Sequence, residues 1–137
     1  MAIGMDNVFG VHEAALRLRA ERTQLLANNI ANADTPGFKA RDIDFSAALK
    51  SATDAGTGAE SIKTTNAKHM GLEGSMGAAL ASDFMMFRTP QQASLDGNTV
   101  ETHIEQAAFS RNAMEYQATL KFFEGKSKSL ISAFKGE

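Results

Sequence analysis

Residues 95–134 carry the cleanest apolar period of the chain, and this period limits the possible folds more than any other feature. The period predicts a long helix that packs along another helix as a coiled coil. A second apolar stripe, rotated from the first, gives this helix more surface to bury than one partner helix can cover. The first stripe alternates spacings of four and three residues, and its members are Phe109, Ala113, Tyr116, Leu120, Phe123, Ser127, Leu130 and Phe134.

The bounds of this helix are expected at residues 98–135. Asp96 or Asn98 can cap its start, and Glu101 follows Asn98 by three residues, as in a capping box. Lysines gather toward the other end, where the helix dipole favours cations.

A second long helix is predicted over residues 7–33. Its apolar residues follow the same alternation of three and four, and an adjoining stripe includes Leu16, Leu26 and Ile30. The helix should end near residues 32–34, because Pro36 disfavours helical geometry at the residue before it and Gly37 permits a positive φ.

Residues 34–97, between the two helices, are expected to be a turn followed by an irregular segment. Residues 38–45 should be extended or irregular, and residues 45–52 could form one or two helical turns capped by Asp44 or Ser46. Residues 51–81 are rich in Gly, Ala, Ser and Thr, which predicts a mobile loop. Residues 84–87 form a dense apolar cluster that should dock beside the helices.

These expectations define one all-α domain over residues 1–137. Its long N- and C-terminal helices pair as a coiled coil, and its middle segment is irregular and partly flexible. At 137 residues, the chain is long enough to bury a core.

Composition limits the class of partner and the compartment. A net charge of −2 provides no basic field for nucleic acid, and no apolar run approaches the ~20 residues of a membrane span. The absence of cysteine rules out disulfides and thiolate metal sites. Residues 1–10 lack the pattern of a signal peptide, so we expect a cytosolic protein or one that is exported without a cleaved signal.

No catalytic, cofactor or metal site is expected. The three histidines, His12, His69 and His103, are scattered without metal-ligand spacing, and surface positions explain them better. No nucleophile elbow surrounds a serine, and the glycine-rich residues 71–77 lack the Lys-Ser/Thr of a phosphate loop. The mixture of Arg17, Arg19 and Arg22 with glutamates indicates a solvated helix face or salt bridges between subunits.

Residues 25–38 form the most specific local pattern. Three asparagines, Asn28, Asn29 and Asn32, occupy five positions at the end of a helix, where they are unfavourable unless their amides are used. These amides can satisfy orphan carbonyl groups or bridge to a neighbouring backbone segment.

Two motifs here resemble those of bacterial flagellar rod and hook proteins. The first is Asn-Asn-Ile-Ala-Asn at residues 28–32 followed by Thr-Pro-Gly-Phe-Lys at residues 35–39. The second is Ser-Leu-Asp-Gly-Asn-Thr-Val at residues 94–100 followed by Tyr-Gln-Ala-Thr-Leu at residues 116–120, and it is similar to the rod proteins of the family. Phe38 stands where the family often has Tyr.

The resemblance implies a structural subunit of the proximal rod, the drive shaft that transmits motor torque. It implies contacts with other copies, with other rod proteins, with the FliE adaptor and with the MS ring, after export by the flagellar type III apparatus. The predicted subunit-interface residues are Leu18, Leu25, Leu26, Asn28, Asn29, Ile30, Asn32, Pro36, Gly37, Phe38, Phe109, Tyr116, Leu120, Phe123 and Leu130.

Two other classes of protein are alternatives to a filament subunit. A soluble helical adaptor or export chaperone would form a small complex of defined stoichiometry, whereas a rod subunit would co-assemble in a helical array. An enzyme would need a concave site with convergent titratable groups, which the sequence does not provide.

Overall fold

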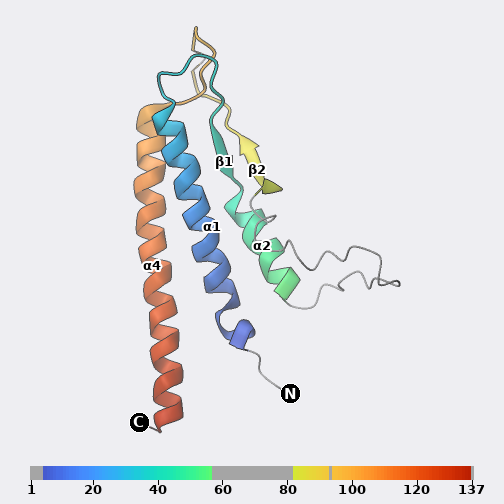
Figure 1. Cartoon of the computed structure of the whole chain (residues 1–137), viewed down its shortest axis with the longest axis vertical. Coiled ribbons are helices and arrows are strands. Elements are labelled where there is room, and N and C mark those ends of the chain that lie inside the picture. Colours follow the sequence, from blue (N-terminus) through green and yellow to red (C-terminus); the bar gives the residue numbers. More distant parts are fainter. Residues whose placement is uncertain (1–4, 57–81, 93, 137) are drawn as a thin grey trace, which may run out of the picture.

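The computed structural model describes residues 5–56, 82–92 and 94–136. Two long helices, α1 and α4, lie side by side along the long axis, and α2 and a small sheet contact α1 (Figure 1). The predicted fold class, mostly helical with long terminal helices and a less regular middle, is confirmed, while supercoiling of the helix pair stays a prediction. The elements in order are α1 (Met5–Ala31), β1 (Arg41–Ile43), α2 (Phe45–Gly56), β2 (Met85–Phe87) and α4 (Thr102–Lys135).

Helix α1 ends close to the predicted place and for the predicted reason. Its last helical residue is Ala31, and the Asn32 side-chain amide donates to the carbonyl of Asn28 at 2.8 Å. Gly37 has a φ of 72°, which reverses the chain immediately after Pro36. The asparagine-rich end of the helix therefore uses its amides on the backbone, as the sequence indicated.

Helix α4 begins later than residue 98, and the predicted caps are wrong. The N-cap is Glu101, and its side chain makes no capping hydrogen bond. Asp96 and Asn98 are unavailable as caps because their side chains form turns: the Asp96 carboxylate accepts from the Asn98 amide, and the Asn98 side chain accepts from the Val100 amide.

The apolar core lies between α1 and the sheet-and-α2 layer. Leu18, Ile43 and Ala48 are its buried members, and half-buried residues complete it, namely Leu25, Phe45, Leu49 and Phe84. The Asp44 carboxylate caps α2 by accepting from the Ala47 amide at 3.0 Å, as predicted. This layer holds the sheet against α1.

The middle segment is more regular than predicted in its described parts. β1 and β2 pair antiparallel, with Asp42 opposite Met86. Residues 51–56, expected to be a mobile loop, continue α2 to Gly56, while residues 57–81 lie outside the described residues. Residues 85–87, expected to dock beside the helices, form a strand with exposed side chains, so that only Phe84 of that cluster packs on the core.

The face of α4 that meets α1 differs from the predicted apolar seam. Its two buried residues are Glu105 and Asn112, both polar. Of the predicted seam, Phe123 contacts Phe9 of α1, with ring centroids 4.9 Å apart. Tyr116, Leu120 and Phe134 are exposed, whereas Phe109, Phe123 and Leu130 of the same seam are half-buried, so α1 covers the seam only in part. The spacing identified an apolar stripe correctly but not what covers it.

A polar clamp joins the end of α1 to the loop before α4. The Asn98 side-chain amide lies 2.7–3.1 Å from three carbonyl oxygens, those of Asn32, Ala33 and Thr35. The Gly37 amide donates to the Asp96 carbonyl at 2.9 Å. These bonds satisfy carbonyl groups that the end of a helix leaves without partners.

We expect Asn98→Ala to lower the free energy of unfolding by about 2 kcal/mol, because it removes a buried amide that donates to three carbonyl groups. Asn28→Ala is the control, because Asn28 lies at an exposed position in the last turn of α1, the end that the clamp holds. This substitution should change the free energy of unfolding by less than about 0.5 kcal/mol. Urea unfolding of the purified chain, followed by circular dichroism, measures both. Equal effects of the two substitutions would contradict a stabilising role for the polar clamp.

Candidate assembly interface

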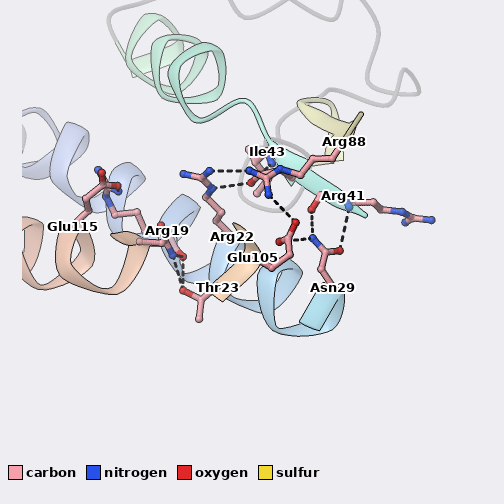
Figure 2. Close-up of polar contacts among 11 residues, drawn as sticks. Arg19, Arg22, Thr23, Asn29, Arg41, Ile43, Arg88, Glu105 and Glu115 are labelled. Carbon is pink, nitrogen blue, oxygen red and sulfur yellow. Dashed lines mark hydrogen bonds and ion pairs between the residues drawn. The ribbon is translucent and has the colours of Figure 1, made fainter. Parts of the chain in front are cut away.

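Four charged side chains meet where α1, the sheet and α4 converge (Figure 2). The Arg22 guanidinium of α1 makes a bidentate pair with the Asp42 carboxylate of β1, both bonds measuring 2.8 Å. The Arg88 guanidinium approaches the same carboxylate at 3.5 Å and donates to Glu105 of α4 at 2.7 Å. We call Arg22, Asp42, Arg88 and Glu105 the charged junction.

Asn29 extends the charged junction further along α1. Its side-chain amide donates to the Glu105 carboxylate at 3.1 Å and to the Arg41 carbonyl at 2.8 Å, and its oxygen accepts from the Arg41 amide. Figure 2 shows Asn29 between Arg41 and Glu105. Asn29 therefore joins the outer edge of β1 to α4.

Burial makes the junction sensitive to the loss of any member. Glu105 and Asn29 are each only 1% exposed. Two cations face two anions, so the junction is neutral, and the hydrogen bonds that Arg22 donates to Asp42 raise the pKa of Arg22. Because each charge has a partner, the arrangement serves structure and not proton transfer.

A second set of polar contacts lies further along the helix pair. The Asn112 amide donates to the Arg19 carbonyl at 2.9 Å and to the Thr23 hydroxyl at 2.8 Å (Figure 2). Arg19 also pairs with Glu115 of α4, and its guanidinium carbon lies 4.4 Å from the centre of the Phe45 ring. The arginines of α1 thus bind groups within this chain.

Apolar side chains remain exposed on the outside of this framework. On α4 they include Met114, Phe122, Ile131 and Phe134, which are 54–85% exposed. Val11 of α1, Met86 and Phe87 of β2 and Leu95 of the loop before α4 are exposed as well. Such surface is typical of a chain that associates with other proteins.

The predicted interface residues divide into two groups. Leu18, Leu26 and Asn29 are buried within the chain, so any effect they have on a neighbouring subunit is indirect. Half-buried positions are Leu25, Ile30, Asn32, Phe38, Phe109, Phe123 and Leu130, and exposed positions are Asn28, Pro36, Gly37, Tyr116 and Leu120. The interface role of the set stays a prediction.

Sequence reasoning missed Asp42, Arg88 and Glu105. Their partners are distant in the sequence, and a lone charged residue on a helix gives no sign that it is buried. One signal was present: Arg22 falls on the apolar stripe of α1, where a cation needs a carboxylate partner.

Within the described ranges, no three His, Asp or Glu side chains form a group that could hold a metal ion. Likewise, no helix among these residues is both long and apolar enough to span a bilayer.

Comparison with known proteins identifies the family. A family model described as flagella basal body rod protein matches residues 9–39. The chain is 45% identical to the flagellar basal body rod protein FlgB of Aeromonas hydrophila over 139 residues, covering 100% of this chain and 99% of that protein. It is 43% identical to FlgB of Cereibacter sphaeroides, with 98% of each covered, and 37% identical to FlgB of Salmonella typhimurium, with 96% of each covered.

The chain belongs to the FlgB family of flagellar basal body rod proteins. As a member of the FlgB family it is a structural subunit of the rod in the flagellar basal body, and not an enzyme. Family membership also implies assembly with other rod and flagellar proteins. The framework of buried polar contacts is thus the internal support of an assembling subunit.

Removing the central carboxylate tests the charged junction. Glu105→Ala leaves Arg88 without its closest anion and removes one of the two acceptors of the Asn29 amide, so we expect the free energy of unfolding to fall by about 3 kcal/mol. Urea unfolding provides the measurement.

The control is Glu13→Ala, which breaks the exposed pair with Arg17 on α1. That pair should contribute less than about 0.5 kcal/mol. A loss at Glu105 no larger than the loss at Glu13 would contradict a structural role for the junction.

Proposed function

We propose that the apolar side chains of α4 that α1 leaves exposed form the surface on which neighbouring subunits pack in the rod. Tyr116 and Leu120 are 36% and 38% exposed, and Phe134 is 85% exposed. Since the three lie on one side of the helix, their removal from water can drive association. This exposed flank is the observation that carries the proposal.

The charged junction supports the proposal because it attaches α4 to α1 without using these exposed apolar side chains. Glu105 and Asn112 attach the first half of α4 to α1 through polar bonds. Several apolar side chains of α4 are therefore left exposed and remain available to a neighbour. The terminal helices of adjacent copies and of related axial proteins would pair as coiled coils, with the chain acting as one rod-protein domain over residues 1–137.

The finer placement in the basal body is part of the same proposal. The chain would form part of the proximal rod, transmit motor torque, and contact the FliE adaptor and the MS ring. It would leave the cytoplasm through the flagellar type III export apparatus, without a cleaved signal peptide. Resemblance of residues 28–39 and 94–100 to rod-protein motifs supports this placement.

Leu120→Asp tests the flank. The side chain is exposed in the single chain, so the substitution should leave the fold stable to within about 1 kcal/mol. In an assembled rod the carboxylate would be desolvated against a neighbour without a partner, which costs several kcal/mol. We expect loss of motility and of rod assembly in cells that contain normal amounts of the protein.

Ala118→Asp is the matched control, because two residues along a helix point in nearly opposite directions. Ala118 is exposed, and this variant should remain motile. Swimming in soft agar and recovery of the chain in purified basal bodies measure both variants. Normal motility of cells that carry Leu120→Asp would contradict the proposal.

A further inference from the structure

Helix α1 lies between two layers, with α4 on one side and α2 with the small sheet on the other (Figure 1). The side chain of Arg19 on α1 contacts both layers. A side chain that is bound on both sides can transmit a change in one layer to the other.

Toward α4, Arg19 is bound through its side chain and through its backbone. The guanidinium pairs with the Glu115 carboxylate, and Figure 2 shows the two side chains together. The Arg19 carbonyl accepts a hydrogen bond from the Asn112 side-chain amide at 2.9 Å. Asn112 and Glu115 lie three residues apart, hence on one side of α4. Arg19 is therefore a direct part of the attachment of α4 to α1.

Toward α2, the same guanidinium lies over an aromatic ring. Its carbon is 4.4 Å from the centre of the Phe45 ring, which is within the range of cation–π attraction. Phe45 is the first residue of α2, and it packs half-buried on the apolar core. The contact with Arg19 is thus one of those that hold α2 against α1.

The two contacts of the guanidinium strengthen each other. The side chain of Arg19 is 14% exposed, whereas that of Glu115 is 42% exposed. An ion pair with so exposed a carboxylate contributes little by itself, because water screens it. The Phe45 ring shields one face of the guanidinium from water, and the carboxylate in turn keeps the guanidinium over the ring. Removing either partner therefore weakens the contact with the other.

The Nε atom of Arg19 provides no independent anchor. It is buried and has no hydrogen-bond partner among the described residues. Arg22, one turn further along α1, differs in this respect, because it binds Asp42 through both Nε and Nη2 at 2.8 Å. The position of Arg22 is fixed by one bidentate pair, whereas the position of Arg19 depends on Glu115 and Phe45 together.

We propose that Arg19 couples the two layers, so that the attachment of α4 to α1 also stabilises α2 on the opposite side of α1. The coupling is a property of the single chain and does not depend on how neighbouring subunits pack. It is reciprocal, because α2 must then stabilise the attachment of α4 to the same extent. Any event that draws Glu115 away from Arg19 loosens α2 without touching it.

Hydrogen exchange of the purified full chain, followed by mass spectrometry, tests the coupling from the α4 side. Glu115→Ala removes the carboxylate and changes no residue of α2. We expect the amides of residues 45–56 to exchange about fivefold faster, at the low end of typical couplings between sites. Residues 102–109 of α4, which the charged junction holds, should change by less than about twofold.

Glu124→Ala is the control on the same helix. Glu124 is an exposed residue further along α4, on the side of Glu115 away from the charged junction. This variant should leave the exchange of residues 45–56 unchanged. It thereby separates the coupling from a general effect of removing a carboxylate from α4.

Phe45→Leu tests the reverse direction, because it keeps an apolar side chain on the core but removes the ring. It should accelerate the exchange of residues 112–119 of α4 by a similar factor. In the double variant, Glu115→Ala with Phe45→Leu, the acceleration should be smaller than the product of the two single effects. Each substitution already weakens the contact that the other removes.

Faster exchange of residues 45–56 in Glu115→Ala but not in Glu124→Ala supports the coupling, even if Phe45→Leu fails to fold. Unchanged exchange of residues 45–56 in Glu115→Ala overturns it. Acceleration by the same factor at residues 45–56 and 102–109 also overturns it, because this result indicates a general loss of stability. A double variant whose effect equals the product of the single effects contradicts it as well.

Discussion

The rest of the structure depends on the buried carboxylate of Glu105. It is 1% exposed and receives hydrogen bonds from Arg88, which follows β2, and from Asn29 of α1. A buried carboxylate is costly unless its partners stand in the correct places. These bonds therefore set the register of α4 along α1, and they fix the sheet against both helices.

Fixing the helix pair with polar bonds divides the molecule into two functional parts. On one side, α1 covers a small apolar core with β1 and α2. On the other side, α4 is attached through Glu105 and Asn112, and much of its apolar surface faces outward. An assembling subunit benefits from this division, because the surface that drives association is kept separate from the contacts that define the fold.

Local physical rules made the end of α1 and the start of α2 predictable. Pro36 and Gly37 end α1 through φ restrictions that act on adjacent residues, and Asp44 caps a helix that begins beside it. The charged junction was not predictable, because Glu105 and Asn29 lie 76 residues apart and either could have been solvated. Likewise, the period through Tyr116 and Leu120 defines a stripe, but periodicity contains no information on which body covers it. Part of the candidate interface could thus be predicted as apolar, but not as exposed.

Hydrogen exchange, measured on the free chain and on isolated basal bodies, most directly tests the division between the contacts that define the fold and the surface that drives association. The account predicts slow amide exchange around Asn29 and Glu105 in both states. Residues 126–135 should exchange rapidly in the free chain and at least about tenfold more slowly after assembly. Equal protection of residues 126–135 in the two states would contradict the claim that α4 is completed by neighbouring subunits.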